Sequence, residues 1–182
     1  MRSHFAITSK LLGTYSSERS EYIHKLTFRP ATVHRQASIQ FSFKHREYIV
    51  IPRRFTLDRI MFDDDTAYAS SIDCEPNVLG HQIKDALSQC KQVSKTIHEM
   101  HNIWGNRQYV PLTVSAAKTL DEYYKDYYPI RAYYKDKKLW IAAASSEKVD
   151  LPAQALERSC KDSVLGSETM KLMERVQQLL SQ

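Results

Sequence analysis

The sequence predicts an α+β fold: an antiparallel sheet built from two hairpins and packed on a long amphipathic helix, with a helical hairpin at the C-terminus. Three observations support this prediction. Two stretches alternate apolar and polar residues with the period of two that is typical of half-buried strands. Another stretch carries apolar residues at helical spacing over more than three heptads. Strands and helices do not alternate along the chain as in parallel βαβ folds, so we expect antiparallel pairing.

The first hairpin is predicted within residues 37–52. Apolar residues occupy every second position from Ala37 to Phe43, the polar segment 44–47 allows a turn, and residues 48–51 return as the second strand. Pro52 cannot donate a hydrogen bond to a neighbouring strand, so we expect this strand to end there or to lie at an edge. A similar alternation over residues 22–29 predicts one more strand before the hairpin.

The long helix gives the strongest pattern in the chain. Apolar residues recur from Leu79 to Trp104 at alternating spacings of four and three. Asn77 can cap its start and Gly105 its end, which gives about 27 residues, or roughly 40 Å. We expect this helix to pack on the sheet; pairing with the same helix of a second copy or with a partner is the alternative. Cys90 and Trp104 are poor seam residues for a parallel coiled coil, which favours the core position.

Two shorter elements follow the long helix. A helix capped by Thr113 or Ser115 is expected to end before Pro129, because the residue before a proline disfavours the helical conformation. The second hairpin spans residues 130–143, with its turn at Asp136-Lys137.

The two ends of the chain are predicted to differ. A helix from Asp150 that breaks at Gly166, followed by another from Ser167, would form the C-terminal helical hairpin. Residues 1–17 contain no acidic residue and form a basic arm before a single α+β domain of residues 18–182.

We expect a cytoplasmic protein. An organellar location is the alternative, because the Ser/Thr-rich basic arm also has the composition of a transit peptide.

Composition excludes several classes of protein. The chain is 42% hydrophobic and 26% charged, as ordinary globular domains are. No apolar run approaches the roughly 20 residues of a membrane span, so we expect no membrane contact. Three unpatterned cysteines fit a reducing compartment. Four scattered glycines build no phosphate-binding loop, and no activated nucleophile or metal-ligand spacing stands out. We therefore expect no metal and no cofactor. An enzyme is a third alternative, although no residue stands out as its nucleophile or base.

Positive charge is concentrated in the first third of the chain. The net charge is +5, and residues 1–60 carry eleven Lys/Arg against four Asp/Glu. Basic side chains at strand ends around the first hairpin would bind phosphates if they converged on one rim. Alternatively, they solvate a sheet edge and oppose aggregation. The candidate phosphate-binding residues of this rim are Arg35, Lys44, Arg46, Arg53 and Arg54.

A second candidate region interleaves aromatic and basic residues. Residues 123–138 hold six tyrosines and five Lys/Arg. Aromatic rings can stack on unpaired bases while basic groups neutralise phosphates, as in single-strand and RNA binders. Tyrosines also pack well in any sheet, and an exposed tyrosine cluster suits a protein partner. The residues assigned to nucleic-acid contact are Arg131, Tyr133, Tyr134, Lys137 and Lys138.

The sequence therefore predicts a non-catalytic accessory or regulatory protein that binds DNA or RNA. The alternative is a protein-binding regulator or inhibitor, for example of immunity or antitoxin type. Such a protein would use the acidic 63–75 loop together with the tyrosine patch. The candidate partner-binding residues are Asp63, Asp64, Asp65, Tyr124 and Tyr128.

Overall fold

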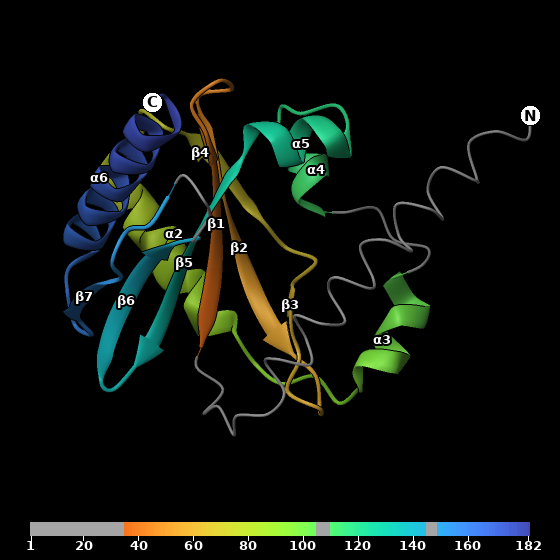
Figure 1. Cartoon of the computed structure of the whole chain (residues 1–182). Helices are drawn as coiled ribbons and strands as arrows, with labels where there is room; N and C mark the ends of the chain where they lie inside the picture. The colour runs from red at the N-terminus through yellow and green to blue at the C-terminus, as the bar shows by residue number, and fades with distance from the viewer. Residues whose placement is uncertain (1–34, 105–109, 145–148) are drawn as a thin grey trace, which may run out of the picture. The chain divides into compact units, whose positions relative to one another are not determined.

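The computed structural model describes residues 35–104, 110–144 and 149–182 (Figure 1). These residues belong to a compact unit that spans His34–Gln182. The basic arm and the strand predicted at residues 22–29 lie outside the described residues. Within the described part, seven strands form one antiparallel sheet and are accompanied by five helices. The predicted α+β class is confirmed, and no described helix is long and apolar enough to span a membrane.

The sheet has the order β3-β2-β1-β5-β6-β7, and β4 pairs with β2 beside β3. Both predicted hairpins are present, and they meet because β1 pairs with β5. The strands are β1 (Gln36–Ser42), β2 (Glu47–Phe55), β3 (Met61–Asp63), β4 (Tyr68–Ser71), β5 (Tyr128–Lys135), β6 (Lys138–Ala143) and β7 (Gln154–Glu157).

The helices flank the sheet on both sides and produce two cores. Residues of α2 and α6 pack with strands β1, β2, β5 and β6 in the main core, on one face. Residues from the α4–α5 region pack with Ile49 and Ile51 in a smaller core on the opposite face. Strand β2 is thus buried on both faces, which explains its uninterrupted apolar run. The helices are α2 (Pro76–Gln89), α3 (Ile97–Trp104), α4 (Val110–Val114), α5 (Leu120–Asp126) and α6 (Asp162–Leu180).

The second hairpin turns without glycine. Asp136 and Lys137 have φ angles of 50° and 63°, so both central residues of the turn lie in the left-handed region. Positive φ at both positions is the mark of a type I′ turn, whose twist matches that of the flanking strands. The predicted turn position is therefore confirmed.

Strand β2 does not end at Pro52 but continues to Phe55. Strand β4 pairs with residues 47–50 of β2, and β3 pairs with residues 53–55. The carbonyl of Pro52 accepts the Asp64 amide on this side at 2.8 Å. Its missing N–H faces the same side and falls between the two ladders, where no strand requires a donor.

The single helix predicted over residues 77–104 is wrong: the chain forms α2 and α3 with an extended segment between them. In this segment the Val93 amide donates to the Phe55 carbonyl at 2.9 Å, and the Phe55 amide donates to the Lys91 carbonyl. The Asp58 carboxylate then accepts the Ile97 amide at 3.0 Å, at the start of α3. Hydrogen bonds to the end of β2 thus replace the helical ones.

The C-terminal helical hairpin is also corrected. Residues 154–157 form the edge strand β7, and α6 runs unbroken through Gly166. A Cβ on Gly166 would lie 1.7 Å from the Pro76 carbonyl oxygen, and one on Gly80 would lie 1.9 Å from that of Asp162. The glycine therefore permits a close crossing of α2 and α6 and does not break the helix.

The helix expected to start at Thr113 or Ser115 is likewise replaced by two short ones, α4 and α5. Thr119 caps α5, because its hydroxyl accepts the Glu122 amide at 3.1 Å. The predicted stop before Pro129 is confirmed, since α5 ends at Asp126.

Candidate binding surface

The candidate surface is the face of β5 and β6 that points away from α2 and α6. Ile130, Ala132, Leu139 and Ile141 point into the main core. Successive side chains of a strand point to opposite faces, so the residues between them point outward. We call this surface the β5–β6 outer face; it consists of Arg131, Tyr133, Lys135, Lys138 and Trp140.

Cross-strand pairing fixes the centre of this face. Tyr133 lies opposite Trp140, and Lys135 lies opposite Lys138. Directly opposed residues point to the same side of an antiparallel pair with Cβ atoms about 4.5–5.5 Å apart, so the two aromatic side chains are neighbours. The Trp140 indole N–H donates to the Lys135 carbonyl at 3.2 Å, which holds the ring along the hairpin.

The two aromatic residues are half-buried and belong to neither core cluster of the described residues. Arg131 beside them is exposed. Among the described residues, Arg131, Lys135 and Lys138 form no ion pair with a carboxylate, although Glu157 of β7 lies opposite Lys138. The outer face therefore combines aromatic area with unneutralised positive charge.

The structure brings together part of the set predicted from the 123–138 region. Arg131, Tyr133 and Lys138 lie on the outer face, and Lys137 lies in the turn at its end. Tyr134 points to the opposite side of the sheet: it packs against the main core, and the Arg158 guanidinium lies 4.8 Å from its ring centroid.

The basic residues of the first hairpin do not converge on one rim. Lys44 and Arg46 lie in the β1–β2 turn, whereas Arg53 and Arg54 lie at the far end of β2, roughly 23 Å away along the strand. Arg35, which precedes β1, is exposed. The other four are ion-paired: Lys44 with Asp126 at 2.7 Å, Arg46 with Asp73 at 2.6 Å, Arg53 with Asp63 at 3.2 Å and Arg54 with Asp64 at 2.7 Å.

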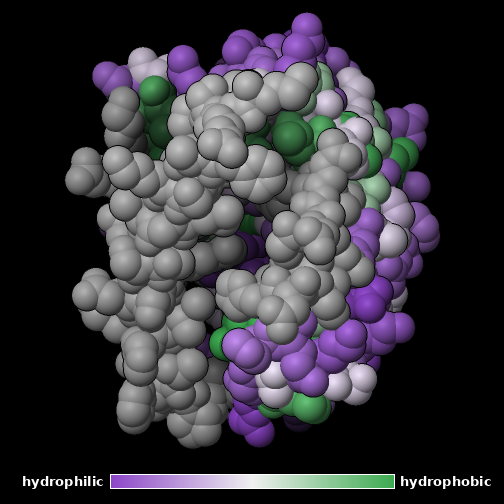
Figure 2. All heavy atoms as spheres, turned by 90° about the vertical axis from the view of Figure 1, so that its right-hand side faces the viewer, coloured by the Kyte–Doolittle hydropathy of each residue, from purple (hydrophilic) through white to green (hydrophobic). Residues whose placement is uncertain are grey.

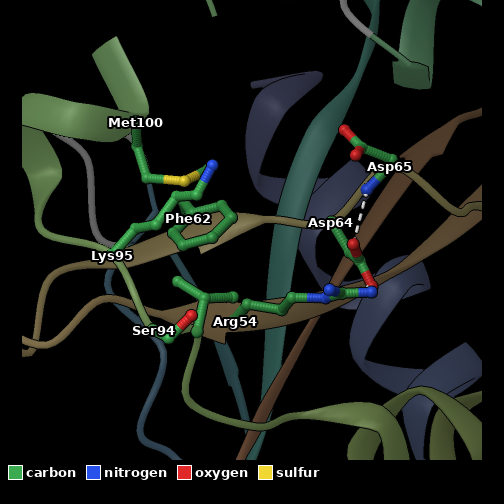
Figure 3. Close-up of a pocket in the computed structure, with 8 residues that line it drawn as sticks. Arg54, Phe62, Asp64, Asp65, Ser94, Lys95 and Met100 are labelled. Carbon is green, nitrogen blue, oxygen red and sulfur yellow. Dashed lines mark hydrogen bonds and ion pairs between the residues drawn. The ribbon is translucent and has the colours of Figure 1, made fainter. Parts of the chain in front are cut away.

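These ion pairs also engage carboxylates of the acidic 63–75 loop, namely Asp63, Asp64 and Asp73. The Asp64 side chain is only 3% exposed and faces a cleft of about 180 Å³ lined by Phe62 and Met100 (Figure 3). The Asp65 amide donates to the Asp64 carboxylate at 2.7 Å. Asp63 and Asp64 are therefore parts of the fold, and the exposed member of the triplet is Asp65.

The two tyrosines assigned to a protein partner lie apart. Tyr124 is 55% exposed on α5. Tyr128 packs against Phe41 on the main-core side of the sheet, and its hydroxyl donates to the Ala144 carbonyl. Figure 2 views the molecule from the right-hand side of Figure 1, and hydrophobic residues form small separate groups on the described surface seen there.

Trp140 is the site residue that sequence reasoning missed. A signal for it was present: with a two-residue turn at Asp136-Lys137, the pairing is symmetric about the turn, and Tyr133 must lie opposite Trp140. The register of the hairpin would have identified the aromatic pair.

Comparison with known proteins gives a likeness of fold. No family model and no curated protein matches the chain. Among solved structures, a protein of unknown function from Neisseria meningitidis matches with a TM-score of 0.59 and 13% identity, over 78% of this chain and 94% of that chain. A chain of the CdiA-CT/CdiI toxin and immunity complex from Yersinia pseudotuberculosis matches with a TM-score of 0.55 and 15% identity, over 76% of this chain and 95% of that chain.

Proposed function

We propose that this chain is a protein-binding regulator of immunity type, which inhibits a partner protein by binding it through the β5–β6 outer face. The observation that carries the proposal is the Tyr133–Trp140 pair, set beside Arg131 and outside both cores. Tyrosine, tryptophan and arginine are the residue types that dominate binding energy at protein interfaces. The likeness in fold to a chain from a toxin and immunity complex supports the same direction.

A protein partner fits the surface better than nucleic acid does. Four of the five basic residues expected to hold phosphates are already paired with carboxylates. Phosphate binding would have to break these pairs or rely on the few cations of the outer face. A compact aromatic centre with flanking cations instead matches an interface with a buried hot spot and a charged rim. The partner surface is therefore expected to be acidic around an apolar centre.

The outer face is also prepared for binding before a partner arrives. Strand β6 is paired with residues 130–135 of β5 along its whole length and joined to it by a two-residue turn, and β1 and β7 extend the sheet on either side. The Trp140 ring is held by its hydrogen bond to Lys135. A surface that is rigid in the free protein loses little conformational entropy on binding, which favours affinity.

The test is a capture experiment with matched variants of the full chain. Wild type, Trp140→Ala, Arg131→Glu and the charge-matched control Arg175→Glu, an exposed position on α6, are used to capture proteins from extract of the source cells. We expect one protein to be retained by both wild type and Arg175→Glu. Trp140→Ala is expected to weaken the binding of that protein roughly 30-fold or more, because hot-spot truncation costs about 2 kcal/mol or more. The activity of that protein is then assayed with and without the chain.

Two results would count against the proposal. If wild type and all three variants retained the captured partner equally, the outer face would not be part of the interface. Tight binding of labelled oligonucleotides, with affinity falling linearly on a log-log plot against salt concentration, would replace the protein partner by nucleic acid.

A further inference from the structure

A separate polar cluster lies where the β1–β2 turn meets α5. The His45 Nε2 atom lies 3.1 Å from Asp126 Oδ2 and 3.7 Å from Glu122 Oε1. One ligand atom from each of the three residues lies within 4.8 Å of the other two. An imidazole nitrogen and two carboxylate oxygens thus converge on one small volume.

Helix α5 orients both carboxylates. Glu122 and Asp126 are four residues apart, so they share one face of the helix. The Glu122 Oε2 atom accepts the Lys118 amide at 2.8 Å, which leaves Oε1 to face His45. Asp126 is the last residue of the helix, where the negative end of the helix dipole disfavours an anion and favours a nearby cation.

The imidazole is held equally well. The His45 amide donates to the Ser42 hydroxyl at 3.2 Å. The ring stacks on Tyr127 at a centroid distance of 5.6 Å and an interplanar angle of 18°, and the Tyr127 hydroxyl donates to Glu47. The His45 side chain is 14% exposed, so its ring has few alternative positions.

A cationic group already occupies part of this cluster. The Lys44 ammonium lies 2.7 Å from Asp126 Oδ2 and 4.0 Å from Glu122 Oε1, and its hydrogen bond lowers the pKa of Asp126. The Lys44 side chain is 62% exposed, so it can move into solvent without opening the core. The two carboxylates therefore form a cation site whose present occupant is displaceable.

We propose that His45, Glu122 and Asp126 bind Zn²⁺, with water completing a tetrahedral site and Lys44 displaced. Zinc is bound by imidazole nitrogen and carboxylate oxygen at about 2.0–2.2 Å, which places tetrahedral ligand atoms roughly 3.3–3.5 Å apart. The observed separations of 3.1 and 3.7 Å lie on either side of that value. Mg²⁺ prefers an all-oxygen shell and keeps its water, so the imidazole selects against it.

The experiment is calorimetric titration of the full chain with ZnCl₂. The variants are His45→Gln, Glu122→Gln and Lys44→Ala, with His81→Gln as the matched control, because His81 also contacts a carboxylate, Asp162, at 3.3 Å. Loss of His45 or Glu122 is expected to weaken one zinc site by 10-fold or more, since loss of an outer-shell partner alone costs about 10–100-fold. Lys44→Ala is expected to tighten the same site, and His81→Gln to leave it unchanged.

Circular dichroism establishes that each variant is folded before titration. The proposal is overturned if wild type binds no zinc, if His45→Gln and wild type bind it equally, or if Lys44→Ala weakens it. MgCl₂ that competes at equal concentration would overturn the assignment to zinc. The zinc proposal does not depend on the proposed function. Because Trp140 lies outside the cluster, Trp140→Ala is expected to leave zinc binding unchanged.

Discussion

Two reciprocal glycines allow α2 and α6 to cross in backbone contact, and Gly80→Ala tests this contact. An added Cβ would lie 1.9 Å from the Asp162 carbonyl oxygen, which is backbone and cannot rotate away. Restoring an ordinary separation of about 3.5 Å would require the helices to separate by roughly 1.6 Å. Over-packing of this kind costs about 1–3 kcal/mol, and we take the upper end because the obstacle is backbone. Alanine returns about 1 kcal/mol through its higher helix propensity, so we expect a net loss of about 2 kcal/mol.

Urea unfolding followed by far-UV circular dichroism measures this loss as a lower midpoint at an unchanged slope. Gln178→Ala, at an exposed position of α6, is the control and should change stability by less than about 0.5 kcal/mol. Gly166→Ala should behave like Gly80→Ala, and the double variant should cost less than the sum, because one separation of the helices relieves both contacts. A neutral or stabilised Gly80→Ala protein would follow propensity alone and would refute the close crossing.

Three further predictions concern single side chains. Lys84 donates a hydrogen bond that lowers the pKa of Asp162. That contribution is complete above the unfolded-state pKa of about 3.9 and is lost as pH falls through the lower folded-state value, so the stability gap between wild type and Asp162→Asn in urea titrations should close below about pH 4. Lys137→Gly should stabilise by roughly 1 kcal/mol, seen as a higher thermal midpoint, because Lys137 has a φ of 63°; a lower midpoint would contradict the turn geometry. Asp64→Asn should destabilise by about 1–2 kcal/mol in urea, less than a fully buried pair would, because Arg54 is 34% exposed; no change would show that the ion pair contributes nothing.

The hairpins were predictable from the sequence, whereas the break between α2 and α3 was not. Alternation and turn residues are local, and they fixed strands β1, β2, β5 and β6. The helical spacing of apolar residues continues through Cys90 and Val93, although the backbone there is extended. Both side chains are at least half-buried in the extended segment, so their apolar character does not reveal the break. The break follows from hydrogen bonds to Phe55, which is distant in sequence, and no glycine or proline marks it.

The same distinction applies to the candidate surface. Period two separates the faces of a strand but cannot tell which face a helix will cover, because the cover comes from elements elsewhere in the chain. Charge counts failed for a related reason. Arg53 and Arg54 raise the local charge, but Asp63 and Asp64 neutralise them through the pairing of β2 with β3. Only the charge that remains after such pairs are subtracted is available to a partner.

The cations of the β5–β6 outer face, which form no ion pair within the described part of the chain, lie beside two aromatic residues, and these aromatic residues are the informative feature. A sheet face that only had to meet water would be solvated by its charged side chains, as Lys135 and Lys138 are placed to do. Tyr133 and Trp140 instead hold large aromatic surfaces together on that face without contributing to either core of the described residues. Burial of the part of these two rings that is still exposed would add hydrophobic free energy that the isolated fold does not gain. The aromatic pair, and not the total positive charge, is therefore the feature from which the function of this surface is inferred.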